Sequence, residues 1–318
     1  MTSFDLAARR AFALTHPALR SAMTERTTIL LEATGRADVT GSTVARLAAV
    51  IGDYSVSDLW LTFAIVHAEL PPPHLVRRLR RVRELDGPFA AVQFLIENLP
   101  DTRRRDPVPT VSVVGVGTVL MDVTGLLPGD LVSEGRGAGR RFARAWNPLS
   151  SVLPVTWSAS RRALRALTAD EARSLGIEPK VPPVGDVVVP NGATYVLLGT
   201  IDKPRSSERL IALGAVSGNA TASIGYGLRQ LIGSEAYERQ MGEERFSWHV
   251  AAQRSLQHLA VIGDSVIEQY RGWERMLPAI GLTGPTLHAF SYSETGSEVP
   301  DAEWQLLARS VGSAIGIH

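Results

Sequence analysis

The chain has 318 residues, of which 45% are hydrophobic and 20% are charged, as is ordinary for a globular protein with room for two sizeable cores. Its formal net charge of +1 gives no whole-molecule basis for binding nucleic acid or a membrane. The absence of cysteine excludes disulfides, thiolate nucleophiles and cysteine-based zinc sites, and is compatible with a cytoplasmic location.

The chain also shows no pattern typical of targeting to a membrane. No basic stretch followed by an apolar core opens it, so no signal peptide is expected. The longest apolar runs, LWLTFAIV and VSVVGVGTVLMDV, are shorter than the roughly 20 residues that a transmembrane helix needs. The sequence therefore predicts a soluble protein without a transmembrane segment.

Residues 1–105 are predicted to form a helical N-terminal domain. Apolar residues recur there at helical spacing, and Ser42 and Ser55 each precede an apolar stripe as a helix N-cap does. Three consecutive prolines, Pro71–Pro73, interrupt the pattern. The segment 100–110 is polar and rich in proline and is predicted to be a linker. Five or six short helices are expected, including those over 16–36, 42–52, 55–70, 74–85 and 89–99.

One of these helices, over residues 74–85, contains five arginines. Such a helix could bind an anionic surface, either lipid or nucleic acid. The sequence favours an ordinary solvated face instead, because acidic residues follow closely and no aromatic residues alternate with the arginines to stack on bases.

Residues 106–318 are predicted to form one Rossmann-like α/β domain. The segment 110–124 is almost entirely apolar and predicts two buried strands separated at Gly115–Gly117. Alternation of strands and helices after it predicts a mostly parallel sheet with helices on both faces. Further strands are expected over 151–159, 193–199, 260–265 and 285–290, and helices over 206–218, 246–259, 266–281 and 301–310.

A glycine- and arginine-rich stretch, SEGRGAGRRFARAWNP, spans residues 133–148. Gly137 and Gly139 are expected in a loop that leads into a helix, where unpaired N–H groups and the helix dipole favour phosphate. Arg140 and Arg141 could add positive charge. The spacing matches neither the Rossmann fingerprint nor a P-loop. On local sequence alone, a flexible basic connection explains the stretch equally well.

No metal site is expected from the sequence. The seven histidines show none of the spacings typical of zinc sites. His249, beside Trp248 in an expected helix, is interpreted as a half-buried structural histidine. The Gly-x-Ser-x-Gly elbow of the α/β-hydrolases is absent as well.

The order of several segments resembles the N-terminal half of bacterial GT-B glycosyltransferases. In that family a strand ending Asp-Val-Thr, here Asp122–Thr124, precedes a glycine- and arginine-containing loop and helix, here AGRRFARAW. A Gly-Tyr segment follows, here Gly225–Tyr226, and then a strand whose counterpart is AVIGDS. The resemblance covers roughly residues 110–290.

The resemblance implies transfer of a sugar from a nucleotide-sugar to a glycan or small-molecule acceptor, as in a hexosyltransferase, with no further cofactor and no metal. It places Asp122 or Thr124 in a catalytic role at the end of a strand. Arg144 and Tyr226 would contact substrate. The phosphates of the donor would face Gly137, Gly139, Arg140 and Arg141.

The chain also departs from the family. Gly227 replaces an aspartate, and Gly263 replaces a serine. The second, donor-binding domain of GT-B enzymes is expected where the chain ends, so a separate or following domain would complete the site. Two alternatives stay open: a catalytically silent glycosyltransferase-like scaffold, and a module that binds anionic surfaces.

Overall fold

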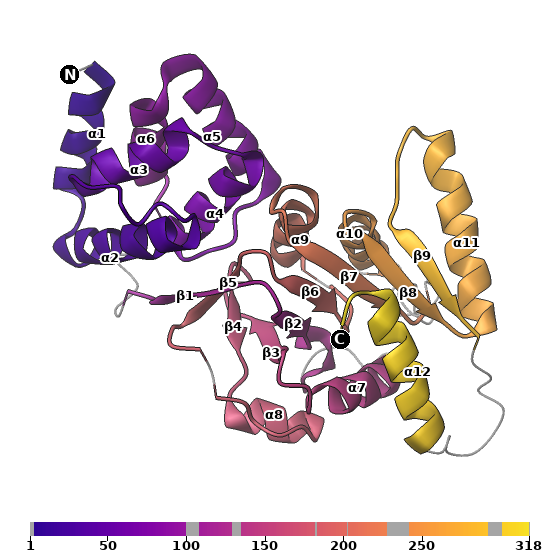
Figure 1. Ribbon diagram of the computed structural model, residues 1–318. Helices are drawn as coiled ribbons and strands as arrows, with labels where there is room; N and C mark the ends of the chain where they lie inside the picture. The colour runs from indigo at the N-terminus through magenta and orange to yellow at the C-terminus, as the bar shows by residue number, and fades with distance from the viewer. Residues whose placement is uncertain are drawn as a thin grey trace.

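The computed structural model describes residues 3–99, 108–128, 135–181, 183–201, 203–227, 242–291 and 301–317. The chain folds into an α/β structure in which six helices precede the first strand (Figure 1). Most of the predicted linker, residues 100–107, lies outside the described residues. None of the described helices combines the length and the apolar character needed to cross a membrane.

The first six helices are α1 (Ser3–Leu14), α2 (Pro17–Ala33), α3 (Thr43–Gly52), α4 (Val56–His67), α5 (Pro73–Asp86) and α6 (Pro88–Glu97). The serines expected as caps are confirmed. Ser42 accepts a hydrogen bond from Ala45 N at 3.3 Å, and Ser55 forms a capping box with Asp58. Proline occupies the first turn of α2, α5 and α6, where its missing N–H costs nothing. Helix α1 was not singled out by the sequence.

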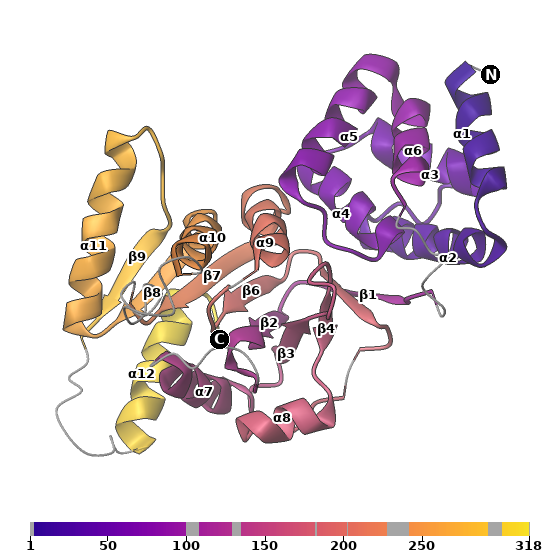
Figure 2. The same ribbon diagram turned by 180° about the vertical axis from the view of Figure 1, so that it is seen from behind.

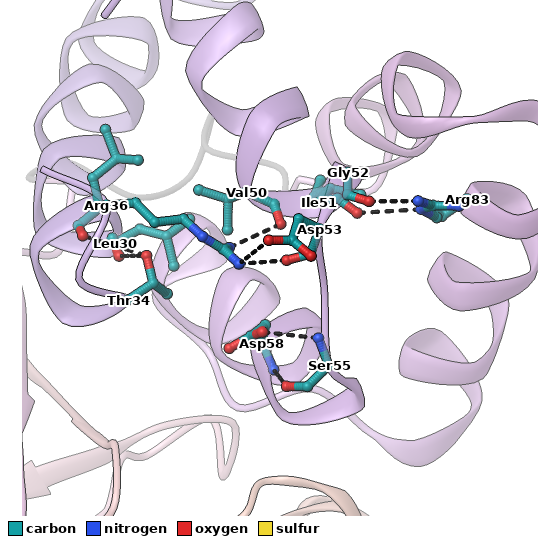
Figure 3. A network of polar contacts seen from close by, with 11 residues as sticks. Leu30, Thr34, Arg36, Val50, Ile51, Gly52, Asp53, Ser55, Asp58 and Arg83 are labelled. Carbon is teal, nitrogen blue, oxygen red and sulfur yellow. Dashed lines mark hydrogen bonds and ion pairs between the residues drawn. The ribbon is translucent and has the colours of Figure 1, made fainter. Parts of the chain in front are cut away.

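Two arginines from neighbouring segments hold the C-terminal end of α3 (Figure 3). Arg36 donates to Val50 O at 3.2 Å and to the backbone carbonyl of Asp53. Arg83, from the arginine-rich helix α5, donates to Ile51 O at 3.3 Å. These bonds satisfy carbonyls that the end of a helix leaves without partners, and they place positive charge where the helix dipole favours it.

The strands are β1 (Val111–Val114), β2 (Val119–Asp122), β3 (Val152–Trp157), β4 (Leu164–Ala166), β5 (Val187–Pro190), β6 (Thr194–Leu197), β7 (Ala220–Gly225), β8 (His258–Ile262) and β9 (Thr286–Phe290). They form one sheet in the order β1-β5-β4-β3-β2-β6-β7-β8-β9. β4 runs antiparallel to both of its neighbours, and every other pair is parallel. The predicted mostly parallel sheet is confirmed, as is the turn at Gly115–Gly117 between β1 and β2.

Helices cover both faces of the sheet, as predicted (Figures 1 and 2). They are α7 (Gly135–Trp146), α8 (Ala169–Leu175), α9 (Pro204–Val216), α10 (Gly242–Arg254), α11 (Asp264–Ala279) and α12 (Asp301–Ala314). Alternation along β2 shows the two faces. Met121 packs in a cluster with Phe142 of α7 and Trp304 of α12. Leu120 packs in another cluster with Leu213 of α9.

The six N-terminal helices and the sheet share a hydrophobic core. Trp60 of α4 belongs to the same cluster as Tyr195 of β6 and Leu210 of α9. Backbone hydrogen bonds also join the two parts, as between Leu70 N and Arg162 O at 2.8 Å. The expected boundary near residue 105 therefore separates two kinds of secondary structure that are packed together.

The predicted helix over 246–259 is wrong at its C-terminal end. Helix α10 ends at Arg254, and β8 already begins at His258. Between them, Ser255 N bonds to Ala252 O in a turn, and Gln257 N bonds to Thr221 O beside β7. Pairing with the neighbouring strand overrides the local helical pattern there. The sequence also missed the short elements β4, α8 and β5.

Candidate functional site

The candidate site lies at the carboxyl ends of β2 and β6, in the centre of the sheet. From β2 the chain passes through α7 to β3 on one side, whereas from β6 it passes through α9 to β7 on the other. The two connections leave adjacent parallel strands in opposite directions (Figures 1 and 2). In open α/β sheets such a topological switch point is where ligands usually bind.

Glycines bring the chain segments at this edge into close contact. A methyl group added to Gly199, after β6, would lie 2.8 Å from Gly125 Cα, after β2. One added to Gly139, in α7, would lie 2.6 Å from Leu126 Cδ2 and 3.0 Å from Leu198 O. Contacts this short are possible only without a Cβ atom. The start of α7 is therefore packed directly against the ends of both central strands.

Asp122, the predicted catalytic carboxylate, is fully buried at the end of β2. Its Oδ1 accepts hydrogen bonds from Thr124 N at 2.9 Å and from Thr124 Oγ1 at 2.6 Å. Its Oδ2 accepts one from Trp157 Nε1 at 2.9 Å and another from the Tyr195 hydroxyl. Burial raises the pKa of Asp122, and the four hydrogen bonds oppose that shift. The carboxylate is therefore used to join β2, β3 and β6.

Thr124, the other predicted catalytic residue, belongs to the same network. Its hydroxyl, which donates to Asp122, accepts from Trp157 N at 2.9 Å. Thr156 Oγ1 lies 3.1 Å away and must act as the donor, since the single proton of Thr124 is already used. The polar side-chain atoms of both predicted catalytic residues are thus engaged internally.

The glycines of the basic stretch lie in a helix and not in the predicted loop. Helix α7 begins at Gly135, so Gly137 and Gly139 fall in its first two turns. The predicted loop is wrong at these positions. The close packing of Gly139 on Leu126 explains the early start, because a helix brings its backbone against the strand ends there. Gly137 is exposed, and a methyl group added to it would meet nothing within 4 Å. Residues 133 and 134 lie outside the described residues.

The three predicted binding arginines of α7 point to different neighbours. Arg140 donates to Leu126 O at 3.2 Å, near the candidate site. The guanidinium of Arg141 lies over the ring of Trp304 in α12, 5.4 Å from its centroid. Arg144 donates to Leu175 O at 3.2 Å, at the C-terminal end of α8. Only Arg140 is thus held beside the strand ends.

Tyr226, predicted to contact substrate, directly follows β7 at the same edge of the sheet. It packs against the cluster that contains Leu126 and Phe142, which places it on the α7 side. Its hydroxyl is buried and has no hydrogen-bond partner in the described part of the chain. Burial raises the pKa of this phenol well above its ordinary value. A buried phenol without a partner is costly, so a ligand oxygen within reach would stabilise it.

His249 is structural, as the sequence suggested, although it is fully rather than half buried. Its Nδ1 accepts a hydrogen bond from Ile201 N at 3.1 Å. Burial lowers its pKa to about 4, so the ring is neutral at pH 7. Among the described residues, no group of three or more potential ligands could hold a metal ion.

The sequence did not identify Thr156, Trp157 and Tyr195 as partners of Asp122. They lie 34, 35 and 73 positions further along the chain, in β3 and β6. The only local signal is that polar and aromatic residues interrupt otherwise aliphatic strands.

Three of the five arginines of helix α5 interact with other residues of the six N-terminal helices. Arg78 lies over the Phe94 ring at 5.4 Å, and Arg80 pairs with Glu84 at 2.7 Å. With Arg83 bound to α3, two arginines of this helix show no such contact in the described part of the chain, Arg77 and Arg81. This favours the ordinary solvated face over a dedicated anionic-surface module.

A comparison with protein-family models, curated proteins and solved structures finds no match for this chain.

Proposed function

We propose that the chain is the acceptor-side half of a glycosyltransferase, which transfers a sugar from a nucleotide-sugar to an acceptor. One observation carries the proposal. The segments that resemble GT-B enzymes are far apart in the sequence, yet the ends of β2 and β7 and the start of α7 meet at one edge of the sheet. That edge contains the switch point, where a ligand is expected on topological grounds.

In this proposal the donor diphosphate approaches the first turn of α7. The N–H groups of a first helical turn lack intrahelical partners, and the dipole favours an anion. Gly137 is exposed there and leaves the backbone open to close approach. Arg140, held beside Leu126, adds positive charge that would stabilise the leaving diphosphate. A donor-binding domain, in the same chain or a separate one, would complete the site.

The roles of Asp122 and Thr124 change accordingly. Their polar atoms are engaged with one another, with β3 and with β6. They act as positioning residues, which fix the strand ends against which α7 and the acceptor lie. Tyr226 contributes its unpaired hydroxyl to the acceptor side.

A pair of glycine variants tests the proposal. Gly137 in α7 and Gly272 in α11 both lie in helices with open space around them. Replacing either by alanine is expected to stabilise the helix by about 1 kcal/mol. At Gly137 the added methyl group also obstructs the proposed phosphate, which would cost one charge-assisted hydrogen bond, about 1.5–3 kcal/mol.

The assay is release of nucleoside diphosphate from a panel of nucleotide-sugars, with a panel of glycan and small-molecule acceptors. It uses the natural gene product purified from its source cell, whose intact mass is measured first. Transfer is expected to fall at least about 10-fold in Gly137→Ala and to stay unchanged in Gly272→Ala. Equal activity of both variants would contradict the proposal that the donor phosphates lie beside Gly137. Absence of release with every donor would overturn the proposal itself.

A second candidate function is a catalytically silent scaffold of the same fold. The observation that favours it is the internal use of every side-chain oxygen of Asp122 and Thr124. In that case the natural product would release no diphosphate. It would copurify with a protein partner, and this association would not weaken with salt.

A further inference from the structure

A second concave site lies at the amino-terminal edge of the sheet, opposite the candidate glycosyl-transfer site. A pocket of about 640 Å³ opens where β8 and β9 begin. Its walls come from the C-terminal end of α9, the turn between α10 and β8, and the loop between α11 and β9. The volume is within the roughly 300–1,000 Å³ typical of small-molecule sites. None of the residues discussed above as site candidates lines it.

The charge in this pocket is of one sign. That charge is the guanidinium of Arg254, the last residue of α10; His258 adds an imidazole, and none of the described lining residues carries a carboxylate. In the described part of the chain, Arg254 has no hydrogen bond or ion pair, unlike the arginines of α7. A half-buried cation without a protein partner favours an anionic ligand.

Three other polar side chains of the lining, those of Thr283, Thr286 and His258, can also donate. The hydroxyls of Thr283, in the loop before β9, and of Thr286, the first residue of β9, have no partner among the described residues. The ring of His258 is held in place by a contact of 3.1 Å between its Nδ1 and Nε2 of His288. Arg254, the two threonines and His258 thus offer donors from separate walls of one pocket, as an anion with several oxygens requires.

One wall of the pocket is apolar. Ile211 and Ala215 of α9 line it together with Leu256. A methyl group added to Gly214, between them, would lie 2.3 Å from Ser255 O, so the end of α9 is packed closely against the turn before β8. Two of the three walls, the end of α9 and the turn before β8, are therefore held against each other without a ligand.

We propose that this pocket binds a small organic phosphate. The phosphoryl group lies on Arg254, His258 and the two threonine hydroxyls, and the organic part lies against Ile211 and Ala215. A phosphoryl group is favoured over a carboxylate because it offers three oxygens to donors on separate walls, whereas a carboxylate offers two. The site is at the opposite edge from the glycosyl-transfer site, so either proposal can fail without the other.

Phenyl phosphate is the probe, and its binding to the purified chain is measured by calorimetry. Arg254→Gln is expected to weaken binding at least about 10-fold, since one charge-assisted contact is lost. Arg275→Gln is the matched control, because this exposed arginine of α11 lies outside the pocket and carries the same charge. The control is expected to bind within about twofold of the original protein.

Two further measurements locate the ligand. Ala215→Phe fills the apolar wall from an exposed position on α9, and is expected to block phenyl phosphate while inorganic phosphate still binds. Benzoate is expected to bind at least about 10-fold more weakly than phenyl phosphate. The proposal is overturned if phenyl phosphate does not bind, if the two arginine variants lose affinity equally, or if benzoate binds as well.

Discussion

Replacement of Asp122 by asparagine tests whether this buried carboxylate is structural. Four donors converge on its two oxygens: Thr124 N and Oγ1 on one, and Trp157 Nε1 and the Tyr195 hydroxyl on the other. An asparagine has the same shape but offers an NH₂ group in place of one oxygen. The two hydroxyls can rotate and accept from this group. The backbone N–H and the indole N–H can only donate, and each faces a different oxygen.

Whichever way the amide is placed, one of these two N–H groups therefore meets another donor. A buried donor without an acceptor costs about 1–3 kcal/mol, and a hydrogen bond to a charged group contributes about 1.5–3 kcal/mol. Removal of a buried charge offsets part of this loss. We expect Asp122→Asn to lower the free energy of unfolding by about 2–4 kcal/mol, measured by urea denaturation at pH 7.5.

Asp186 provides the matched control. Its Oδ2 accepts from Thr110 N at 2.9 Å and from Thr110 Oγ1 at 3.0 Å, as Asp122 does from Thr124, but it is exposed. The amide oxygen of Asp186→Asn can accept both bonds, so the cost is expected to be about 0.5 kcal/mol or less. If Asp122→Asn proves as stable as the original protein, the carboxylate does not hold the strand ends together. A role in catalysis would then be favoured again.

Three other predictions concern different parts of the same structure. Gly139→Ala places a methyl group against Leu126 and is expected to destabilise the fold by about 1–3 kcal/mol in the same denaturation assay. Burial lowers the pKa of His67 to about 3 and that of His249 to about 4, below the unfolded value near 6.5. The folded state keeps both rings neutral, so the protein is most stable above about pH 6.5. This stability is lost as the pH falls from about 6.5 toward the pKa values in the folded state, because the unfolded chain then binds the protons more strongly. Each histidine is expected to lower the free energy of unfolding by about 2 kcal/mol at pH 5 relative to pH 7.5. Replacement of both by glutamine should therefore make the free energy of unfolding nearly independent of pH over this range. Arg144→Ala is expected to lower the free energy of unfolding by less than about 1 kcal/mol and to leave the proposed sugar transfer unchanged, because the guanidinium binds the C-terminal end of α8. A large loss of that activity would instead favour a role for Arg144 in binding substrate.

Local patterns predicted the elements of this fold better than they predicted its site. The apolar segment 110–124 predicted two buried strands, and the glycines within it marked the turn between them. The prediction of burial is correct for β2, whereas β1 lies at the edge of the sheet and only Val111 in it is buried. Ser42 and Ser55 could be recognised as caps because capping depends on residues two or three positions away. The strand β4, by contrast, has only three residues, too few to show a period. Its pairing with β3 and β5 comes from tertiary contacts that no local pattern contains.

The basic stretch shows why composition alone does not identify the residues that could bind an anion. Gly137 and Gly139 look equivalent in the sequence, yet one is open and the other packs against Leu126. Of the three arginines predicted to bind phosphate or substrate, Arg141 lies over the ring of Trp304, and Arg144 donates a hydrogen bond to the C-terminal end of α8. Successive residues on a helix point about 100° apart, so side chains that are neighbours in the sequence point in different directions around the helix. An arginine able to bind an anion must instead be recognised from its neighbours, as proposed for Arg254, which lies in the last turn of α10 and forms no side-chain hydrogen bond or ion pair among the described residues.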